Sequence, residues 1–471
     1  KTAALTPSIR VADCAYNARQ IIEVLRGAAA AGAEIACLPE LCITGYTCGD
    51  LFFQPVLQQG ARDALADVLR DTAGLPLLFV LGLPLTHGGK LYNCAAVCQN
   101  GRVLGVVPKT HLPNYNEFYE KRQFTPAPAE NGVIDLSGAQ VPFGTNLLFQ
   151  CGTQPALTLA VEICEDLWAP LPPSTRHAMA GATLICNLSA SDETIGKAEY
   201  RRALVTGQSA RLLCGYVYAD AGEGESTTDM VFAGHNMVAE NGALLAETAP
   251  FCGGMALTDI DVERLAGERL KNTSFPAEDN ANYEVIPFVL PQNVSPLTRI
   301  VSSAPFVPAD AEQRARRCDA ILAMQASGLK KRLEHTHAKT AVVGISGGLD
   351  SCLALLVTVR AFSLLERPLS DIVAVTMPCF GTTERTRTNA QRLCEALSVT
   401  LQHVDITQTV RSNFADIGQD EARHDVTYEN TQARVRTLVL MNLANRLGGL
   451  VIGTGDLSEL ALGWVTYNGD H

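Results

Sequence analysis

The sequence predicts an α/β protein built from two domains that each alternate strands with helices. At 471 residues the chain is too long for one typical domain. Short apolar runs of β type alternate with Ala-, Arg- and Leu-rich amphipathic segments before about residue 260, and a similar alternation returns after residue 311. Such alternation is typical of sheets layered with helices.

In the first half, an amphipathic helix is expected over 15–31, followed by a strand at 35–38. Further apolar runs predict strands at 77–83, 103–107, 157–164 and 183–188. Residues 271–294 are rich in Asn, Pro, Ser and acids with poor periodicity, and prolines continue to residue 308. We therefore expect a domain over 1–265, a linker over 266–310 and a second domain over 311–471.

The second half predicts a doubly wound parallel sheet. Its expected helices cover 311–334, 351–365, 385–397 and 428–446, and its expected strands cover 340–345, 372–377, 401–405 and 450–453. In such a fold, ligands bind at the carboxyl ends of the strands. No internal repeat relates the two halves.

The bulk composition narrows the function classes. The net charge of −12 argues against bulk nucleic-acid binding, although a local pocket can still hold a phosphate. The fifteen cysteines contain no C-x-x-C pair, which favours a reducing compartment. No signal pattern begins the chain and no apolar run reaches the ~18 residues needed to span a bilayer. We expect a cytoplasmic protein without a membrane or nucleic-acid partner.

Residues 344–351 read Gly-Ile-Ser-Gly-Gly-Leu-Asp-Ser, between a predicted strand and a predicted helix. Glycines let the backbone approach an anion, and the first N–H groups of the helix point at it. The Lys of a Walker loop is missing, and an Asp lies in the turn instead. The loop resembles the pyrophosphate loop of ATP pyrophosphatases, which implies transfer of AMP and release of pyrophosphate. The alternative is an ordinary Gly-rich turn.

Three polar residues follow three buried strands of the first half: Glu40, Lys109 and Cys164. If those strands share a sheet, the side chains converge at one edge. The set has a chemical logic, with a thiol nucleophile, a carboxylate base and a cation for the developing oxyanion. Taken singly, a buried Cys is usually a small hydrophobe, and a Glu or Lys at a strand end is usually a solvated loop residue.

The contexts Leu-Pro-Glu-Leu at 38–41, Val-Pro-Lys-Thr-His-Leu-Pro-Asn-Tyr at 107–115 and Val-Glu-Ile-Cys-Glu-Asp-Leu-Trp at 161–168 resemble the nitrilase (carbon–nitrogen hydrolase) superfamily. The resemblance implies an αββα sandwich and a Glu40, Lys109, Cys164 triad. Glu117 matches an auxiliary Glu found near the Lys in many members, or is a loop acid. The implied glutamine-binding groups are Tyr115, Ser191, Lys197 and the backbone N–H of Glu165.

Segments 375–378, 382–386, 428–436 and 453–464 resemble glutamine-dependent NAD synthetases. This implies that deamido-NAD, ATP and glutamine give NAD, AMP, pyrophosphate and glutamate, with Asp350 and Glu459 as Mg2+ ligands. The implied ATP-binding residues are Gly344, Ile345, Ser346, Gly347, Gly348, Leu349, Asp350, Ser351, Thr376, Met377 and Thr454. The implied deamido-NAD-binding residues are Asn430, Glu459, Trp464, Val465, Thr466 and Tyr467.

The resemblance also implies a homo-oligomer, with an octamer as in similar two-domain enzymes, and an internal ammonia channel. Family members continue beyond residue 471 with a loop that carries a catalytic Lys, so we expect the C-terminal end of the domain to be absent. Two other functions stay open. One is a stand-alone amidase whose second domain binds adenylate. The other is an ATP-dependent tRNA-modifying enzyme, which should carry a basic face.

Overall fold

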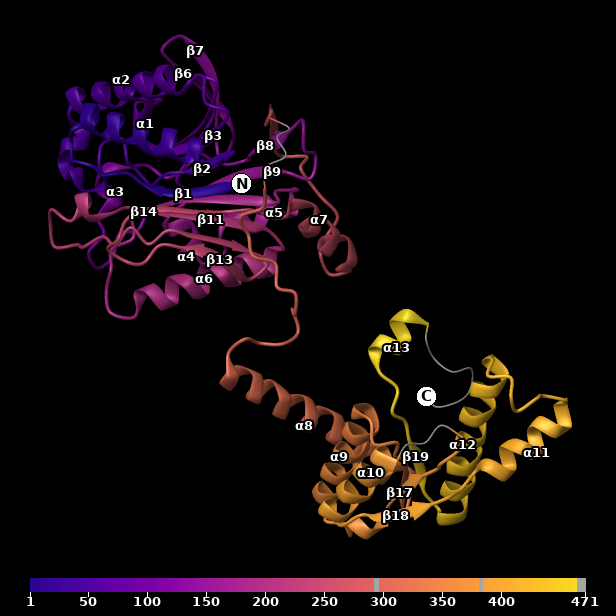
Figure 1. The fold of residues 1–471 in the computed structure, drawn as a ribbon. Coiled ribbons are helices and arrows are strands. Elements are labelled where there is room, and N and C mark those ends of the chain that lie inside the picture. The colour runs from indigo at the N-terminus through magenta and orange to yellow at the C-terminus, as the bar shows by residue number, and fades with distance from the viewer. Residues whose placement is uncertain (292–295, 381–383, 464–471) are drawn as a thin grey trace. The chain divides into compact units, whose positions relative to one another are not determined.

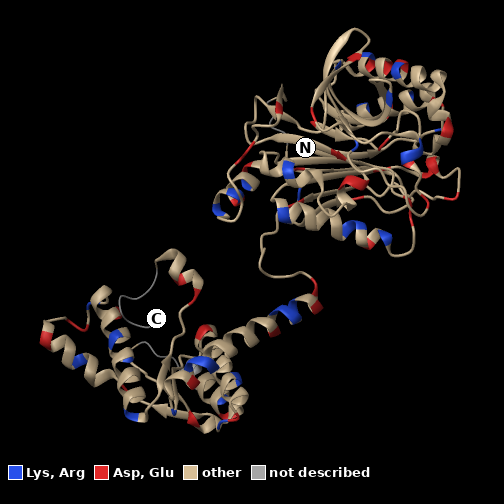
Figure 2. Ribbon diagram, turned by 180° about the vertical axis from the view of Figure 1, so that it is seen from behind, with Lys and Arg blue, Asp and Glu red and all other residues tan. Residues whose placement is uncertain are grey.

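A computed structural model describes residues 1–291, 296–380 and 384–463, shown in Figure 1. The chain divides into two compact units, Lys1–Val301 and Ser302–His471. Figure 2 shows Lys and Arg interspersed with Asp and Glu along the helices of both units. No helix in the described ranges is long and apolar enough to cross a membrane.

Two sheets stack in the first unit. One sheet runs in the order β14 (Gly254–Thr258), β1 (Thr2–Thr6), β2 (Ile35–Cys37), β3 (Leu78–His87), β4 (Lys90–Gln99), β5 (Arg102–Pro108), β7 (Ala139–Phe143), β6 (Gly132–Leu136). The other runs in the order β13 (Ala243–Glu247), β12 (Met237–Glu240), β11 (Gly215–Asp220), β10 (Leu184–Ser189), β9 (Thr158–Ile163), β8 (Leu147–Cys151), β15 (Glu284–Phe288). Apolar side chains of both sheets form a shared core between them.

Helices cover the outer faces of this sandwich, which gives an αββα arrangement (Figure 1). Helices α1 (Cys14–Ala30) and α2 (Pro55–Thr72) pack on the first sheet, while α5 (Pro173–Met179) and α6 (Lys197–Leu212) pack on the second. The shorter helices are η1 (Tyr46–Phe53), α3 (Glu120–Gln123), α4 (Glu165–Trp168), η2 (Glu223–Glu225) and α7 (Val262–Lys271). The predicted layered α/β fold of this half is confirmed.

The second unit has one parallel sheet in the order β18 (Thr400–His403), β17 (Ile372–Thr376), β16 (Ala341–Gly344), β19 (Leu450–Ile452). Successive side chains of β16 point into two different hydrophobic cores. Ala341 and Val343 belong to one core, and Val342 belongs to the other together with Leu443. The helices are α8 (Ala311–Thr336), α9 (Leu349–Leu364), η3 (Leu369–Asp371), α10 (Glu384–Leu397), α11 (Thr407–Ile417), α12 (Val426–Leu447) and α13 (Leu457–Leu462). Helices on both faces confirm the doubly wound sheet.

Several elements were not among those expected from the sequence, including α11 and β15. Helix α11 lies between β18 and α12, and β15 lies inside the segment that composition had suggested as a linker. Strand β15 pairs in parallel with β8, from Glu284 opposite Leu147 to Phe288 opposite Cys151. This edge strand has only one partner and only Phe288 of its five residues is buried, so its sequence shows little apolar periodicity.

Gly82 in β3 lies against the turn that follows β2, so a substitution at Gly82 tests how closely the strand packs on that turn. A Cβ at this position would lie 2.2 Å from the backbone nitrogen of Leu41 and 2.7 Å from the carbonyl oxygen of Pro39. We expect Gly82→Ala to lower the free energy of unfolding by about 1–3 kcal/mol or more. Thermal unfolding followed by circular dichroism measures this.

Gly207 is the matched control, because it lies inside α6 and an added Cβ there would meet nothing within 4 Å. Gly207→Ala should stabilise the unit by about 0.5–1 kcal/mol. Equal effects of the two substitutions would show that the turn adapts freely.

Candidate active site

The three strand-end residues of the first unit converge, although their strands do not share a sheet. Glu40 and Lys109 follow β2 and β5 of the first sheet, whereas Cys164 follows β9 of the second. The sheets pack face to face, so the ends of their strands meet across the sandwich. Lys109 Nζ donates to Glu40 Oε1 at 2.6 Å, and both side chains are fully buried.

A second carboxylate completes this cluster, and it is Glu120 rather than Glu117. Lys109 Nζ lies 2.6 Å from Glu120 Oε1, which also accepts from the Tyr46 hydroxyl at 2.9 Å. Glu117 lines the neighbouring cavities without an ion pair to Lys109. The position of Glu120 between the buried Phe118 and Phe124 was the available sequence signal for an inward-facing acid.

The two carboxylates keep the Lys109 ammonium charged. Burial opposes the charge, but Glu120 and Glu40 outweigh it and raise the pKa of Lys109 well above its usual value. Burial raises the pKa of Glu120 to about 7, against the opposing effect of Lys109. Glu40 also accepts from Asn93 Nδ2 at 2.6 Å and from the Ala190 backbone N–H at 3.0 Å. Its lone pairs are therefore held in fixed directions.

Cys164 lies at a strained turn between β9 and α4. Its φ of 43° is uncommon for a residue with a Cβ, and its N–H donates to Leu188 O at 2.9 Å. Burial, followed by the charge of Glu40, raises the pKa of the thiol, and Lys109 lowers it. The Cys164 thiol thus lies where burial and the carboxylates of Glu40 and Glu120 disfavour its thiolate form.

Asp166 ties the Cys164 turn to the Lys109 strand end. Its Oδ2 accepts from the Ile163 N–H at 3.0 Å, and its Oδ1 accepts from the His111 N–H at 2.8 Å. Asp166 is buried. One carboxylate thus holds backbone from both sides of the sandwich, one position before Cys164 and two positions after Lys109.

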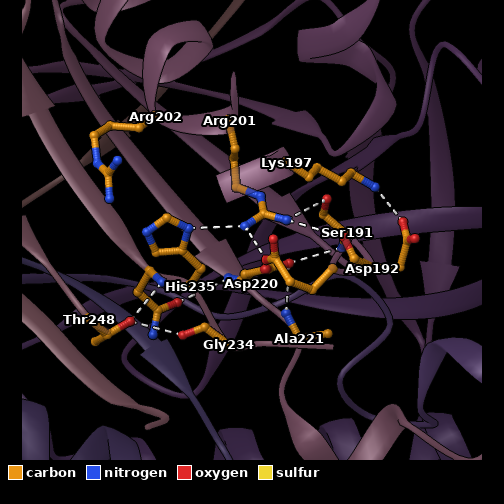
Figure 3. Close-up of polar contacts among 12 residues, drawn as sticks. Ser191, Asp192, Lys197, Arg201, Arg202, Asp220, Ala221, Gly234, His235 and Thr248 are labelled. Carbon is orange, nitrogen blue, oxygen red and sulfur yellow. Dashed lines mark hydrogen bonds and ion pairs between the residues drawn. The ribbon is translucent and has the colours of Figure 1, made fainter. Parts of the chain in front are cut away.

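A cavity of about 380 Å³ opens onto Cys164. Its lining includes all four residues predicted to bind glutamine: Tyr115, Glu165, Ser191 and Lys197. The Tyr115 hydroxyl donates to Glu165 Oε1 at 2.8 Å. Figure 3 shows Lys197 paired with Asp192, and Ser191 beside Arg201. The cavity thus presents hydroxyl, acidic and basic groups within reach of one thiol.

A second cavity, of about 340 Å³, lies beside the first in the same unit. Glu117 and Phe118 line both cavities. Glu120 and Tyr46 line only the second, whose walls also carry Phe52 and Phe124. Glu120 of the Lys109 cluster therefore lines the second cavity, whereas Cys164 lines the first.

In the second unit, the Gly-rich loop between β16 and α9 forms the turn expected from the sequence. Gly347 has a φ of +86°, and Gly348 caps the helix. The Gly348 N–H donates to Ser346 Oγ at 3.3 Å, and Ser346 Oγ lies 3.2 Å from Ser351 Oγ. Asp350 is exposed in the first turn of α9.

Other predicted residues of this unit follow the same edge of the parallel sheet. Thr376 ends β17 and Thr454 follows β19. Glu459 forms a capping box with Asp456, which engages its Oε2 with the Asp456 N–H at 3.1 Å. Asn430 lies on α12. The predicted residues Trp464, Val465, Thr466 and Tyr467 lie outside the described residues.

Replacing Asp166 tests the clamp between the two sheets. In Asp166→Asn, an NH2 group would replace one oxygen that now accepts a backbone N–H, so one buried donor loses its acceptor. We expect a loss of about 1–3 kcal/mol in the free energy of unfolding, measured by urea denaturation. Asp135, which accepts the Gly138 N–H on an exposed hairpin, is the control. Asp135→Asn should change stability by less than about 0.5 kcal/mol, and an equal loss in both variants would contradict the clamp.

Comparison with known proteins agrees with this division into two kinds of site. Residues 1–269 match the carbon-nitrogen hydrolase family, and residues 321–471 match the NAD synthase family. The glutamine-dependent NAD(+) synthetase of Mycobacterium tuberculosis is 45% identical over 99% of this chain and 71% of its own. That of Thermotoga maritima is 28% identical over 99% of this chain and 76% of its own.

A solved glutamine-dependent NAD+ synthetase from Acinetobacter baumannii, in complex with ADP, is 25% identical. It covers 100% of this chain and 77% of its own, with a TM-score of 0.48. The identity to the mycobacterial relative extends over both units. On that match, the chain belongs to the glutamine-dependent NAD(+) synthetase family.

Proposed function

We propose that the first unit hydrolyses glutamine and that the second unit uses the ammonia to convert deamido-NAD to NAD with ATP. The observation that carries the proposal is the buried cluster of Lys109, Glu40 and Glu120 beside Cys164. Such a cluster suits amide hydrolysis, and it lies in one chain with a loop suited to phosphates. The products would be NAD, AMP, pyrophosphate and glutamate.

In the proposed first half-reaction, Glu40 takes the proton of the Cys164 thiol as sulfur attacks the amide carbon of glutamine. Lys109 and the backbone N–H of Glu165 stabilise the negative charge on the carbonyl oxygen. The C–N bond breaks, the proton passes to nitrogen, and ammonia leaves a thioester on Cys164. Water then attacks the thioester, which releases glutamate and restores the thiol.

The charges around the cavity fit the two ends of an amino acid. Lys197 and the Ser191 hydroxyl suit a carboxylate, whereas the acidic Glu165 and the hydroxyl of Tyr115 suit an ammonium group. Lys197 Nζ also lies 5.6 Å from the ring centres of Phe118 and Trp168, so its stem is fixed by aromatic contacts.

In the proposed second half-reaction, the loop 344–351 binds the phosphates of ATP, and Thr376, Met377 and Thr454 bind elsewhere on the nucleotide. Two carboxylates, Asp350 and Glu459, are hard oxygen ligands of the kind that Mg2+ uses together with phosphates. No group of three or more His, Cys, Asp or Glu that could hold a metal ion without other ligands exists in the described part of the chain. A Mg2+ ion here would therefore depend on oxygens of ATP. Such an ion would neutralise phosphate charge during AMP transfer.

Ammonia would leave the first site through the protein rather than through water. In water at neutral pH most ammonia is ammonium, which cannot attack an acyl-adenylate. The second cavity supports this proposal, because it is lined by Glu120 and Tyr46 of the buried cluster and by Phe52 and Phe124.

Cys164→Ala should abolish the release of glutamate from glutamine, while NAD synthesis from added ammonium salt survives, because the thiol serves only ammonia supply. Chromatography of glutamate and NAD measures both reactions. The control is Cys252→Ala, which removes an exposed thiol outside the cavity. Loss of both reactions in a folded Cys164→Ala protein would refute this division of labour.

Asp350→Asn should stop pyrophosphate release with either nitrogen source and leave glutamine hydrolysis intact, because it removes a charged oxygen ligand beside the phosphates. A coupled assay measures pyrophosphate release, and glutamate formation measures glutamine hydrolysis. Asp371→Asn is the control, because Asp371 directly precedes β17 and lies at the end of that strand opposite to Thr376. Unchanged pyrophosphate release in Asp350→Asn would remove Asp350 from the ATP site.

The proposed ammonia passage predicts the source of nitrogen in NAD. With amide-labelled glutamine and excess unlabelled ammonium, NAD should keep most of the label, as mass spectrometry would show. The Cys164→Ala variant under the same conditions should give unlabelled NAD. Dilution of the label to the bulk ratio in the unsubstituted protein would mean that ammonia reaches solvent first.

A further inference from the structure

Arg201 is a fully buried charge beneath the cavity, and the proposed chemistry does not use it directly. It lies one turn after Lys197 on α6. Its guanidinium binds three consecutive residues that follow β10: Ser191 Oγ at 3.2 Å, the Asp192 carbonyl at 3.2 Å and Glu193 Oε2 at 2.9 Å. Figure 3 shows Arg201 between this segment and His235. One side chain therefore fixes the wall of the cavity that carries Ser191.

The far side of Arg201 is held by a buried histidine in a defined tautomer. Arg201 Nη1 donates to His235 Nδ1 at 3.0 Å, so Nδ1 carries no proton. His235 Nε2–H then donates to Glu247 Oε1 at 2.5 Å, and Glu247 also pairs with Arg202. Burial lowers the pKa of His235, which agrees with a neutral ring. The guanidinium is thus held from both sides.

The fixed guanidinium of Arg201 determines how the Ser191 hydroxyl can form hydrogen bonds. Its backbone N–H donates to Asp220 Oδ1 at 2.9 Å, and its Oγ accepts from Arg201. Among the described residues, the Ser191 hydroxyl donates no hydrogen bond. A hydroxyl that already accepts from a cation is polarised as a donor. Ser191 therefore offers the cavity a hydrogen-bond donor and is a poor acceptor.

We propose that Arg201 is a positioning residue that presents the Ser191 hydroxyl as a donor to the α-carboxylate of glutamine. A carboxylate is an acceptor-only group, so it matches a site whose hydroxyl is committed to donating and whose neighbouring cation is Lys197. Arg201 would thereby select an amino-acid amide over a simple amide, without touching the reacting carbon. The inference rests on the proposed glutamine hydrolysis in the first unit.

Arg201→Lys tests this, because a lysine keeps the charge and loses the fork that binds both Ser191 and His235. The KM for glutamine should rise about tenfold, as expected for a weakened bond to a charged group, while kcat stays within about twofold. Alkylation of Cys164 by iodoacetamide, which has no α-carboxylate, should proceed at the unsubstituted rate when followed by peptide mass spectrometry. A merely structural role would slow alkylation and lower kcat as well.

A double substitution asks whether Arg201 acts through Ser191. Ser191→Ala alone should also raise the KM for glutamine, and adding Arg201→Lys should then change it by less than about twofold, because coupled sites are not additive. Arg211→Lys, on the same helix and bonded only to the Gln208 side chain, is the matched control and should behave as the unsubstituted protein.

The outcomes separate the inference from the function on which it rests. If the unsubstituted protein and the Arg211→Lys control release no glutamate from glutamine, the proposed glutaminase is wrong. If they do, an unchanged KM in Arg201→Lys, or additive effects in the double variant, overturns the role of Arg201. Should Arg201→Lys fold poorly, His235→Leu removes one acceptor of Arg201 and should still raise KM with kcat preserved. An unchanged KM there overturns the role equally.

Discussion

The ammonium of Lys109, buried out of water between two carboxylates, is the constraint on which the rest of the first unit depends. A buried ammonium is costly unless it is paired and hydrogen-bonded. Glu40 and Glu120 provide the pairing at 2.6 Å each. Those contacts require the turn after β2, the end of β5 and the start of α3 to meet at fixed positions, and the packed sandwich supplies that rigidity.

The charges of this cluster act on the Cys164 thiol. Glu40 and Glu120 share a single ammonium, so a thiolate would place further negative charge beside carboxylates in a buried place. That repulsion, together with burial, raises the pKa of Cys164. In the proposed glutamine hydrolysis, the thiol proton would therefore move to a carboxylate during attack on the amide, when the new bond compensates for the charge. Strain at Cys164 and the fixed lone pairs of Glu40 prepare that transfer.

In the second unit, by contrast, the described candidate binding groups are not gathered in a buried ion-pair cluster. Its candidate residues lie at strand ends and in a Gly-rich turn, and Asp350 is open to solvent. The hydroxyls of Ser346 and Ser351 form a hydrogen bond with each other, and Glu459 caps the helix to which it belongs. A nucleotide brings its own charge and many acceptors, so backbone N–H groups can bind it without a buried ion-pair cluster. Glutamine carries a small neutral amide, which needs the buried arrangement of the first unit.

The sequence alone could predict whatever depends on local pattern. Apolar periodicity placed the strands of the second unit and part of the first unit, and Glu40, Lys109 and Cys164 were visible because each follows such a strand. The Gly-rich turn was equally visible, because its conformation depends on a few adjacent residues. Residues without periodicity were harder, and α11 and the edge strand β15 were missed for that reason.

Only the tertiary structure decided which side chains meet. Glu117 and Glu120 are three residues apart in an irregular segment, and burial against Phe118 and Phe124 directs Glu120 to Lys109. The three side chains were expected to converge if their strands shared a sheet; they do converge, but Cys164 comes from the opposite sheet. The buried Arg201 shows no signal in the sequence. Pairing between distant segments is fixed by how whole layers pack, and that information is spread over the chain rather than carried by any one motif.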